Sequence, residues 1–554
     1  MGKRETNGDK RQRKRSNTPA MEQTRPVSCA GAVAASTSVR AALSWSLTSK
    51  LLCFGLRTLI ARRYGPAVVA FSDAYLGLLF AIALWPAREV VRRVVLQRPH
   101  LAQRQHWLWC NILWCIGTAF VFIRYINWSV SMLSFRRSKV AYIIVGIGAT
   151  LDASLGEWLH LQCLLHGDSA ALAGRAQADG LAALAQNIVA LWIAQKTGDD
   201  ALGMSLGWFA QSLVGIAVLA RAWRRCTKRR LPTEKPKRSQ KAGSSSWRLW
   251  AHAALQAVFK FFASDAENLF FVLSNRLSIE EVGAYKLAGN LASLVLRYFF
   301  LPLEESVYIV AARLQETESR ASFGEAFVFT LEARLCAVLI ASLLACVGPT
   351  YVPVFLQVVY GKRWVLAASP KDALVAQLLT WYLRSLIAPA LLGTIEAFAT
   401  TAILPRLPSR ILVLHASVSA FISMGFVMGA RWAVVVVGSP LLLIANNAVT
   451  MLLRAELAAA MIRYAFRTDR HLHNFRMPSA FWPATNVLLV TAVWAMVSHY
   501  MVSWVVARGL DVLAMTTLIG WTLVTSLIWA SVAWRAHGSV IKRVLWSRPH
   551  SAHT

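Results

Sequence analysis

The sequence is poor in acidic residues and lacks the short motifs of nucleotide, zinc and disulfide chemistry. Asp and Glu number 27 against 59 Lys and Arg in 554 residues, which gives a formal net charge of +32. No Walker motif is present, so the sequence does not predict ATP hydrolysis by a P-loop. The eight cysteines contain no Cys-x-x-Cys pair, so neither a zinc site nor a disulfide framework is predicted, and no cofactor is expected.

Long apolar runs are abundant. Hydrophobic residues make up 56% of the chain, and the runs recur at about the 20 residues that a helix needs to cross a bilayer. Helices satisfy their own backbone hydrogen bonds inside a membrane, so the sequence predicts an all-α polytopic membrane protein with about 14 transmembrane helices. The predicted spans are 41–61, 67–87, 107–127, 139–165, 178–197, 201–222, 249–276, 282–312, 326–347, 373–400, 408–428, 431–460, 481–506 and 511–535.

The basic residues gather in the N-terminal tail and in alternate loops, as expected of cytosolic segments next to anionic lipid. This distribution favours a multi-pass protein with both termini in the cytosol over a nucleic-acid-binding protein. The first apolar run is of full length, so no cleavable signal peptide is predicted. The predicted organisation is a basic cytosolic tail (1–40), a six-helix half (41–222), a basic cytosolic linker (223–248), a second six-helix half (249–460), a final helix pair (461–535) and a cytosolic tail (536–554).

Several predicted spans carry charged residues, each of which costs about 3 kcal/mol at the centre of a bilayer on insertion scales. In the first span, Lys50 and Arg57 are seven residues apart and share one face of a helix. Two charges of the same sign cannot neutralise each other. They predict either an anionic ligand or ion pairs with acids on neighbouring helices, such as Asp73 or Glu267.

The stretch from Gly283 to Tyr308 is the most unusual predicted span. Asn290, Arg297 and Glu304 repeat at seven-residue spacing and are expected to line one stripe, although a proline before Glu304 should bend the helix. Glu305 lies beside the last of them. A cation at mid-depth with acids near one end indicates a functional surface more than a packing surface.

Other charges in or next to the spans have simpler explanations as well as functional ones. Lys260 and Glu267 are seven apart in the seventh span and are able to satisfy each other. Arg88 and Arg92 share a face after the second span, either as an ordinary positive-inside loop or as a docking site for a lipid phosphate. Isolated polar residues in the remaining spans are predicted to form helix–helix contacts, and they are Asp152, Glu157, Glu396, Asn446, Asn447 and Arg454.

Several of these motifs, taken in order between about residues 43 and 460, resemble the Rft family. The matching stretches are Ala87-Arg-Glu with Arg92-Arg93, Gly156-Glu157, Lys260 to Glu267, Gly283-x-Tyr285, Asn290-Leu-x-Ser-Leu294, Arg297, Pro302-x-Glu-Glu-Ser306 with Tyr308, Tyr360-Gly361, Gly393-x-x-Glu396-x-Phe398 and Asn446. The chain departs from the family pattern at Leu392, where an asparagine is usual, and at Trp158, where a proline is usual.

The resemblance implies an exporter-like fold of two helical bundles in the endoplasmic reticulum membrane. It also implies a role in bringing the heptasaccharide on dolichyl pyrophosphate to the lumen for protein N-glycosylation. The partners expected on this basis are the dolichol-linked oligosaccharide, anionic lipid at the basic loops, and other membrane proteins of the same pathway.

Combined with the charges in the spans, the resemblance gives a translocation hypothesis. The residues expected to bind the pyrophosphate are Lys50, Arg57, Arg88, Arg92 and Arg297. The residues expected to contact the glycan or form a gate are Lys260, Glu267, Asn290, Glu304 and Glu305.

Three alternatives remain at this point. The first is a non-transporting factor that binds or presents the glycolipid, which needs the same recognition chemistry. The second is an ion-coupled exporter of small organic cations, against which the cationic first span argues. The third is a polytopic glycosyltransferase, which would need a sizeable luminal loop with acids, whereas the loop after the first span runs only over 62–66. The preferred hypothesis is therefore not an enzyme.

Overall fold

The computed structural model describes residues 48–91, 106–129, 138–165, 169–228, 267–272, 276–313, 320–361, 373–468, 485–508 and 511–546. Throughout this part the secondary structure is helical, with no strand, as the sequence predicts. Nine of the described helices are long and apolar enough to cross a membrane, and the full count of spans stays a prediction.

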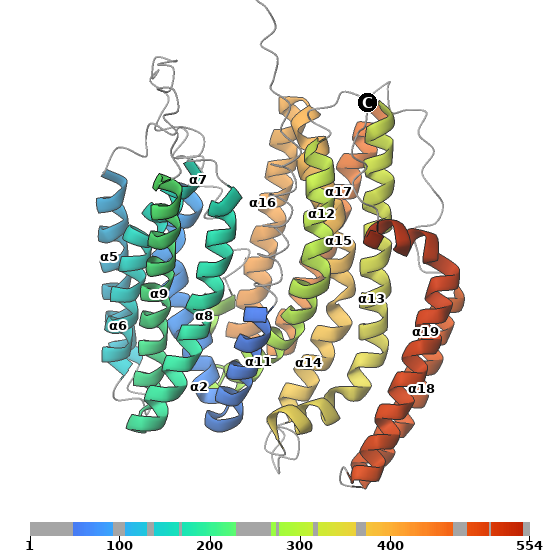
Figure 1. The fold of residues 1–554 in the computed structure, drawn as a ribbon, viewed down its shortest axis with the longest axis horizontal. Coiled ribbons are helices and arrows are strands. Elements are labelled where there is room, and N and C mark those ends of the chain that lie inside the picture. Colours follow the sequence, from blue (N-terminus) through green and yellow to red (C-terminus); the bar gives the residue numbers. More distant parts are fainter. Residues whose placement is uncertain are drawn as a thin grey trace, which may run out of the picture.

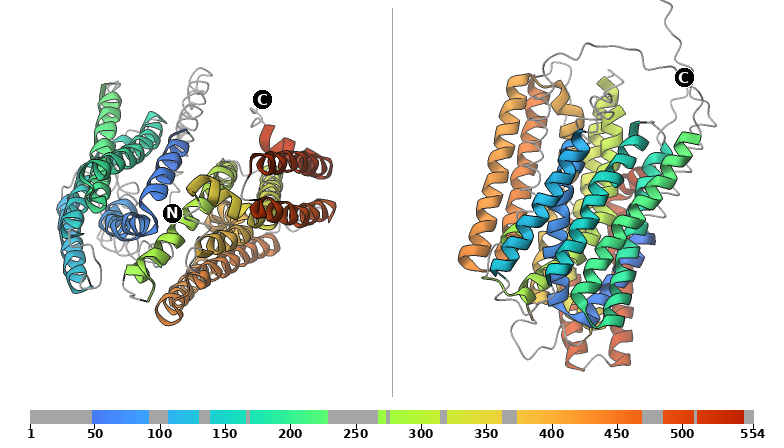
Figure 2. Two further views of the ribbon diagram at one scale, coloured as in Figure 1. Left: turned by 90° about the horizontal axis from the view of Figure 1, so that it is seen from below. Right: turned by 90° about the vertical axis from the view of Figure 1, so that its left-hand side faces the viewer.

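The helices form two bundles and a hairpin (Figures 1 and 2). The first bundle contains a helix over 48–64, α2 (Pro66–Ala70), η1 (Phe71–Leu76), α3 (Gly77–Trp85), η2 (Pro86–Val91), α5 (His106–Ser129), α6 (Ser138–Leu151), η5 (Asp152–Gly156), α7 (Glu157–Leu165), α8 (Ser169–Thr197) and α9 (Asp200–Lys228). The second contains α11 (Ile279–Val295), η6 (Leu296–Phe300), α12 (Leu301–Arg313), α13 (Arg320–Tyr360), α14 (Ala373–Ser385), α15 (Ile387–Phe398), η8 (Ala399–Ile403), η9 (Leu404–Arg406), α16 (Ser409–Arg431), η10 (Trp432–Val437) and α17 (Pro440–Thr468). The hairpin consists of α18 (Thr485–Ala507) and α19 (Val512–Trp546) and packs on α13.

Each bundle has its own apolar core. Leu79 and Val145 are fully buried in the first bundle, in the cluster between α3 and α6. In the second, the Phe327 ring packs at a tilted angle against the rings of Phe398 and Phe466, where α13, α15 and α17 meet. The predicted linker over 223–248 lies mostly outside the described residues, so the predicted domain boundaries stay predictions.

A third apolar cluster belongs to both bundles and joins them at one end. Val69 of the first bundle is buried in it together with Tyr285, Leu356, Leu378 and Val434 of the second. These residues gather near the end of the 48–64 helix and the beginning of α11. We call this group the shared cluster. Because apolar burial contributes about 25 cal/mol per Å², this cluster resists separation of the two bundles at that end.

The tightest contact between the bundles is made by a glycine. A Cβ added at Gly283 of α11 would overlap the carbonyl group of Pro66, the first residue of α2. Seven residues further along each helix, the Asn290 amide donates a hydrogen bond to the Asp73 carboxylate, at 2.8 Å. The elements α2 and α11 therefore run side by side in the same direction and in register, which only a residue without a side chain allows at position 283.

The long helix α13 reaches the shared cluster by bending. It has 41 residues, or about 60 Å of helix, which is about twice the thickness of the hydrocarbon core. Pro349 and Pro353 lie inside it, and Figure 1 shows its last turns running across the end of the second bundle. The bend carries Leu356 and Tyr360 into the shared cluster.

The contact between Gly283 and Pro66 predicts that Gly283→Ala lowers stability, by about 1–3 kcal/mol, because the new methyl group must push two backbones apart. The thermal unfolding midpoint of the detergent-purified protein measures this. Gly55→Ala is the matched control, since a Cβ there meets no atom within 4 Å and the helix gains about 0.5–1 kcal/mol from losing a glycine. Equal midpoints for the two variants would contradict the tight contact.

Candidate functional site

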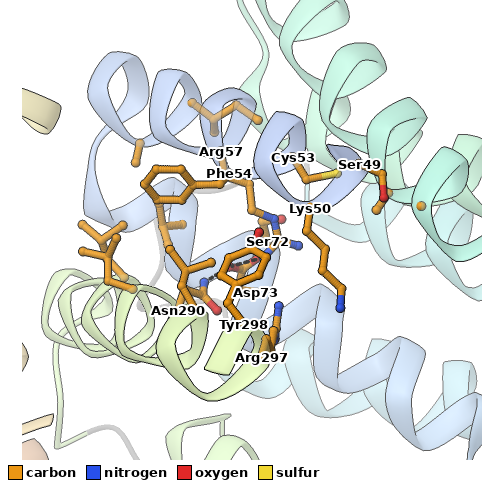
Figure 3. Close-up of a pocket in the computed structure, with 18 of the residues that line it drawn as sticks. Ser49, Lys50, Cys53, Phe54, Arg57, Ser72, Asp73, Asn290, Arg297 and Tyr298 are labelled. Carbon is orange, nitrogen blue, oxygen red and sulfur yellow. Dashed lines mark hydrogen bonds and ion pairs between the residues drawn. The ribbon is translucent and has the colours of Figure 1, made fainter. Parts of the chain in front are cut away.

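A cavity of about 480 Å³ lies between the two bundles, next to the shared cluster (Figure 3). The first bundle contributes residues of the 48–64 helix, α2, η1, α8 and α9, and the second contributes residues of α11, η6 and the end of α13. Ala61, Val69, Leu287 and Tyr360 belong to both the cavity lining and the shared cluster. The shared cluster therefore forms one closed end of the cavity.

The described lining carries more positive than negative charge. Lys50, Arg57 and Arg297 contribute three cationic groups, and Asp73 and Asp179 contribute two acidic ones. Arg57 and Arg297 come from different bundles and are close enough for their charges to repel each other. A cavity with this balance favours an anionic ligand over a cationic one.

One of the three cations already has an acidic partner. Nη1 of Arg57 lies 3.7 Å from Oδ2 of Asp73, and the same oxygen accepts the hydrogen bond from Asn290. The sequence-based expectation that Asp73 pairs with the first span is thus confirmed for Arg57. The contact is long, and the Arg57 side chain is 39% exposed, so Arg57 keeps donors free for another acceptor.

The other two cations have no such partner in the part of the chain that the structure describes. Neither Lys50 nor Arg297 has a carboxylate oxygen within 4.0 Å there, and neither donates a hydrogen bond to another described residue. Figure 3 shows Lys50 extending from its helix towards the side of the cavity where Arg297 and Tyr298 lie. These two side chains are available to a ligand.

The seven-residue spacing read from the sequence places the polar residues at two positions along the helices, Arg57 with Asn290 and Lys50 with Arg297. The 48–64 helix ends next to Pro66, and α11 begins there, so the two helices run in opposite directions. Arg57 and Asn290 meet at Asp73, and each helix then continues for seven residues, or about 10 Å, to Lys50 and Arg297. Both pairs face the same cavity.

Glu267 has a structural role in the described part of the chain. Its carboxylate accepts a hydrogen bond from the Tyr285 hydroxyl at 2.6 Å and pairs with the Lys286 ammonium at 3.2 Å. Lys286 also lies over the rings of Phe271 and Tyr285. The pair borders the shared cluster rather than the cavity. Lys260, the partner expected from the sequence, lies outside the described residues.

Glu304 does not lie on the helix face that its seven-residue spacing predicts. The turn Leu296–Phe300 is π-helical, so it contains one more residue than an α-turn and rotates everything after it about the helix axis. Glu304 consequently packs against Gly393 of α15, where a Cβ would overlap its carboxylate. Glu305 is exposed, and neither acid is among the described cavity-lining residues. Only Asn290 and Arg297 of the predicted stripe reach the cavity.

Two of the predicted helix–helix contacts in the second bundle are confirmed, and the contact of Asn447 stays a prediction. Arg454 of α17 binds Glu396 of α15 at 2.6 Å. The Asn446 amide donates to the backbone carbonyl oxygen of Phe426 on α16 at 2.9 Å. Of the two arginines predicted at the cavity mouth, the Arg88 side chain and the whole of Arg92 lie outside what the structure describes.

Asp179, Tyr298 and Tyr360 are among the cavity residues that the sequence analysis did not assign to a site. Asp179 lies in a predicted span, and a charge inside a span is the signal that identified the other cavity residues. Tyr298 and Tyr360 carry no charge and give no such signal, because aromatic residues are common in membrane helices, although Tyr360 stands in one of the motifs that resemble the family. Tyr360 reaches the cavity only because α13 bends, and its hydroxyl lies 3.5 Å from that of Thr58.

Comparisons with known proteins give three results. The family model described as "Rft protein" matches residues 35–543. A Xenopus tropicalis protein named "Man(5)GlcNAc(2)-PP-dolichol translocation protein RFT1" is 23% identical over 287 residues, which are 48% of this chain and 53% of that protein. A Kluyveromyces lactis protein of the same name is 25% identical over 109 residues, 20% of this chain and 19% of that protein. The chain thus spans about half and about a fifth of the lengths of these two relatives.

The fold also matches a solved structure. It is described as "Lipid II flippase MurJ, inward closed conformation", and it aligns with a TM-score of 0.58 and 10% sequence identity over 89% of this chain and 99% of that one. The likeness confirms the exporter-like fold of helical bundles. At this identity it carries no argument about ligand or activity.

The structural role of Glu267 predicts that Glu267→Gln destabilises the protein by about 3–5 kcal/mol, because it leaves the Lys286 charge buried without a counter-ion. The double variant Glu267→Gln with Lys286→Met removes both charges and should recover most of the thermal midpoint. If Glu267→Gln abolished function with an unchanged midpoint, the residue would belong to a gate, as the sequence analysis expected, and not to the packing.

Proposed function

Because the chain belongs to the Rft family, we propose that it moves a dolichol-linked oligosaccharide from the cytosolic to the luminal leaflet of the endoplasmic reticulum membrane, for protein N-glycosylation. The proposed cargo is the heptasaccharide on dolichyl pyrophosphate, in keeping with the names of the relatives. The observation that carries this proposal is the cationic cavity between the two bundles, in which Lys50 and Arg297 have no acidic partner among the described residues.

The pyrophosphate is the part of the cargo that this cavity suits. Guanidinium and ammonium donors form strong, charge-assisted hydrogen bonds with phosphate oxygens, and Arg57, Arg297 and Lys50 supply both kinds. A doubly charged phosphate also removes the repulsion between the two arginines. Arg88 and Arg92 stay assigned, as a prediction, to capture at the cytosolic mouth.

The size of the cavity limits what it encloses. Pockets of about 300–1,000 Å³ hold ligands of drug size, and this one is about 480 Å³. The pyrophosphate and the nearest sugars fit this volume, whereas the remaining sugars and the dolichol chain must lie outside it in this conformation. Asn290 lines the cavity, and its amide oxygen is left to accept a hydrogen bond from a sugar hydroxyl while its nitrogen donates to Asp73.

Access to the cavity follows from the shared cluster. With both termini in the cytosol, the 48–64 helix ends on the luminal side, so the shared cluster closes the luminal end. Translocation then requires the two bundles to rock apart at that cluster and to close on the cytosolic side. Glu304 packs on Gly393 within the second bundle, and Glu304 and Glu305 stay assigned, as a prediction, to a gate on the cytosolic side rather than to binding.

A non-transporting factor that presents the glycolipid is the second candidate. The tight contact between Gly283 and Pro66, together with the shared cluster, favours it, because a rigid joint suits a static binding site. Export of small organic cations is disfavoured by the excess of positive charge in the lining.

The proposal predicts that Arg297→Ala slows protein-dependent movement of the purified glycolipid across liposome membranes by at least about tenfold. The reason is that a hydrogen bond to a charged group contributes about 1.5–3 kcal/mol. Lys50→Ala should act in the same direction. The measurement is the transbilayer rate of the glycolipid, compared with empty liposomes.

Arg431→Ala is the matched control, since it removes an exposed positive charge at the end of α16 that does not line the cavity. Its rate should equal that of the wild type. A folded wild-type protein that binds the glycolipid but does not speed its movement would eliminate translocation and leave the presenting factor. An unchanged rate for both cavity variants would refute the phosphate site.

A further inference from the structure

The position of Asp73 bears on how the cavity holds a pyrophosphate, an argument that rests on the proposed function. Its Oδ2 atom lies 3.7 Å from the Arg57 guanidinium and 2.8 Å from the Asn290 amide nitrogen. Both groups are hydrogen-bond donors aimed at one carboxylate oxygen. Donors in this arrangement bind any oxyanion, so a phosphate oxygen is able to take the place of the carboxylate oxygen.

The remaining two cations form a neighbouring position. The backbones of Lys50 and Arg297 lie about 10 Å further along their helices than those of Arg57 and Asn290, but the Arg297 guanidinium is near enough to Arg57 and Asp73 for their charges to act on it. The side chains therefore converge in the cavity, as two phosphates joined through one oxygen require. Neither of the two cations has a carboxylate oxygen within 4.0 Å in the described part of the chain. A phosphate arriving there displaces no protein group, whereas a phosphate arriving at Arg57 must displace Asp73.

We propose that the cavity binds the two phosphates of a lipid pyrophosphate at two different positions. One phosphate binds at Lys50 and Arg297, and the other replaces the Asp73 carboxylate at Arg57 and Asn290. Asp73 is thus an internal competitor for the second phosphate. It neutralises Arg57 when no ligand is bound, and it returns to Arg57 when the cargo leaves.

This arrangement distinguishes two classes of lipid phosphate. A lipid monophosphate fills only the position at Lys50 and Arg297 and leaves Asp73 in place. A lipid pyrophosphate fills both and breaks the hydrogen bond between Asp73 and Asn290, which links the first bundle to the second. Only the pyrophosphate therefore loosens the joint between the bundles.

The test compares the affinities of farnesyl monophosphate and farnesyl diphosphate for the detergent-purified full-length protein, by microscale thermophoresis. Asp73→Asn removes the competing charge but keeps an oxygen that accepts from Asn290. It should raise the affinity for farnesyl diphosphate by roughly tenfold and that for farnesyl monophosphate by less than about threefold. Asp179→Asn is the control for cavity charge, and it should raise both affinities by the same factor.

Arg57→Gln supplies a second variant in case Asp73→Asn does not fold. It should weaken binding of farnesyl diphosphate by roughly tenfold and bring the two affinities close together. Equal changes for the two ligands in either variant, or no change, would overturn the two-position assignment. Failure of the phosphate site itself has a different signature, in which the wild type binds neither ligand or Arg297→Ala binds both as well as the wild type does.

Discussion

The need to neutralise charge inside a membrane protein governs the organisation of this molecule. A cation without water or a counter-ion is costly at bilayer depth, so each one must meet an acid, a ligand or a wet cavity. Lys286 has Glu267, Arg454 has Glu396, and Arg57 has a long contact to Asp73. The helices that carry the cavity cations, 48–64 and α11 to α12, are not among the nine described helices with the composition of a membrane span, whereas Pro66–Trp85, which carries Asp73, is one of them.

The sequence was sufficient to place the cavity but not all of its contacts. An α-helix has a fixed period, so the heptads of Lys50 with Arg57 and of Asn290 with Arg297 identified side chains that do face one cavity. The same reasoning failed for Glu304, because the π-turn before it changes the period and leaves no mark in the spacing of polar residues. The pairing of Lys286 with Glu267 depends on how two helices cross. The spacing of residues in the sequence carries no information about that crossing.

The residues that carry the family resemblance are mostly those that hold helices together. Gly283 allows α11 to meet Pro66, Gly393 accommodates Glu304, and Asn446 binds the backbone of α16. Of the motifs quoted from the sequence, Asn290, Leu291, Leu294, Arg297 and Tyr360 line the cavity in the described part of the chain. A mutation in most of the signature is thus expected to act first on the assembly of the bundles, and its effect on any ligand is secondary.

The bend in α13 has a mechanical consequence. Tyr351 lies between the two prolines, and its hydroxyl forms hydrogen bonds with Ser498 of α18 and Thr522 of α19, at 3.0 and 3.1 Å. Tyr360, at the end of the same segment, lies against the helix over 48–64. A change of angle at Pro349 shifts the contacts at both places, because both tyrosines follow it along the helix. The closed end of the cavity and the hairpin on the outer side of the second bundle therefore share one hinge, and motion of either is transmitted to the other.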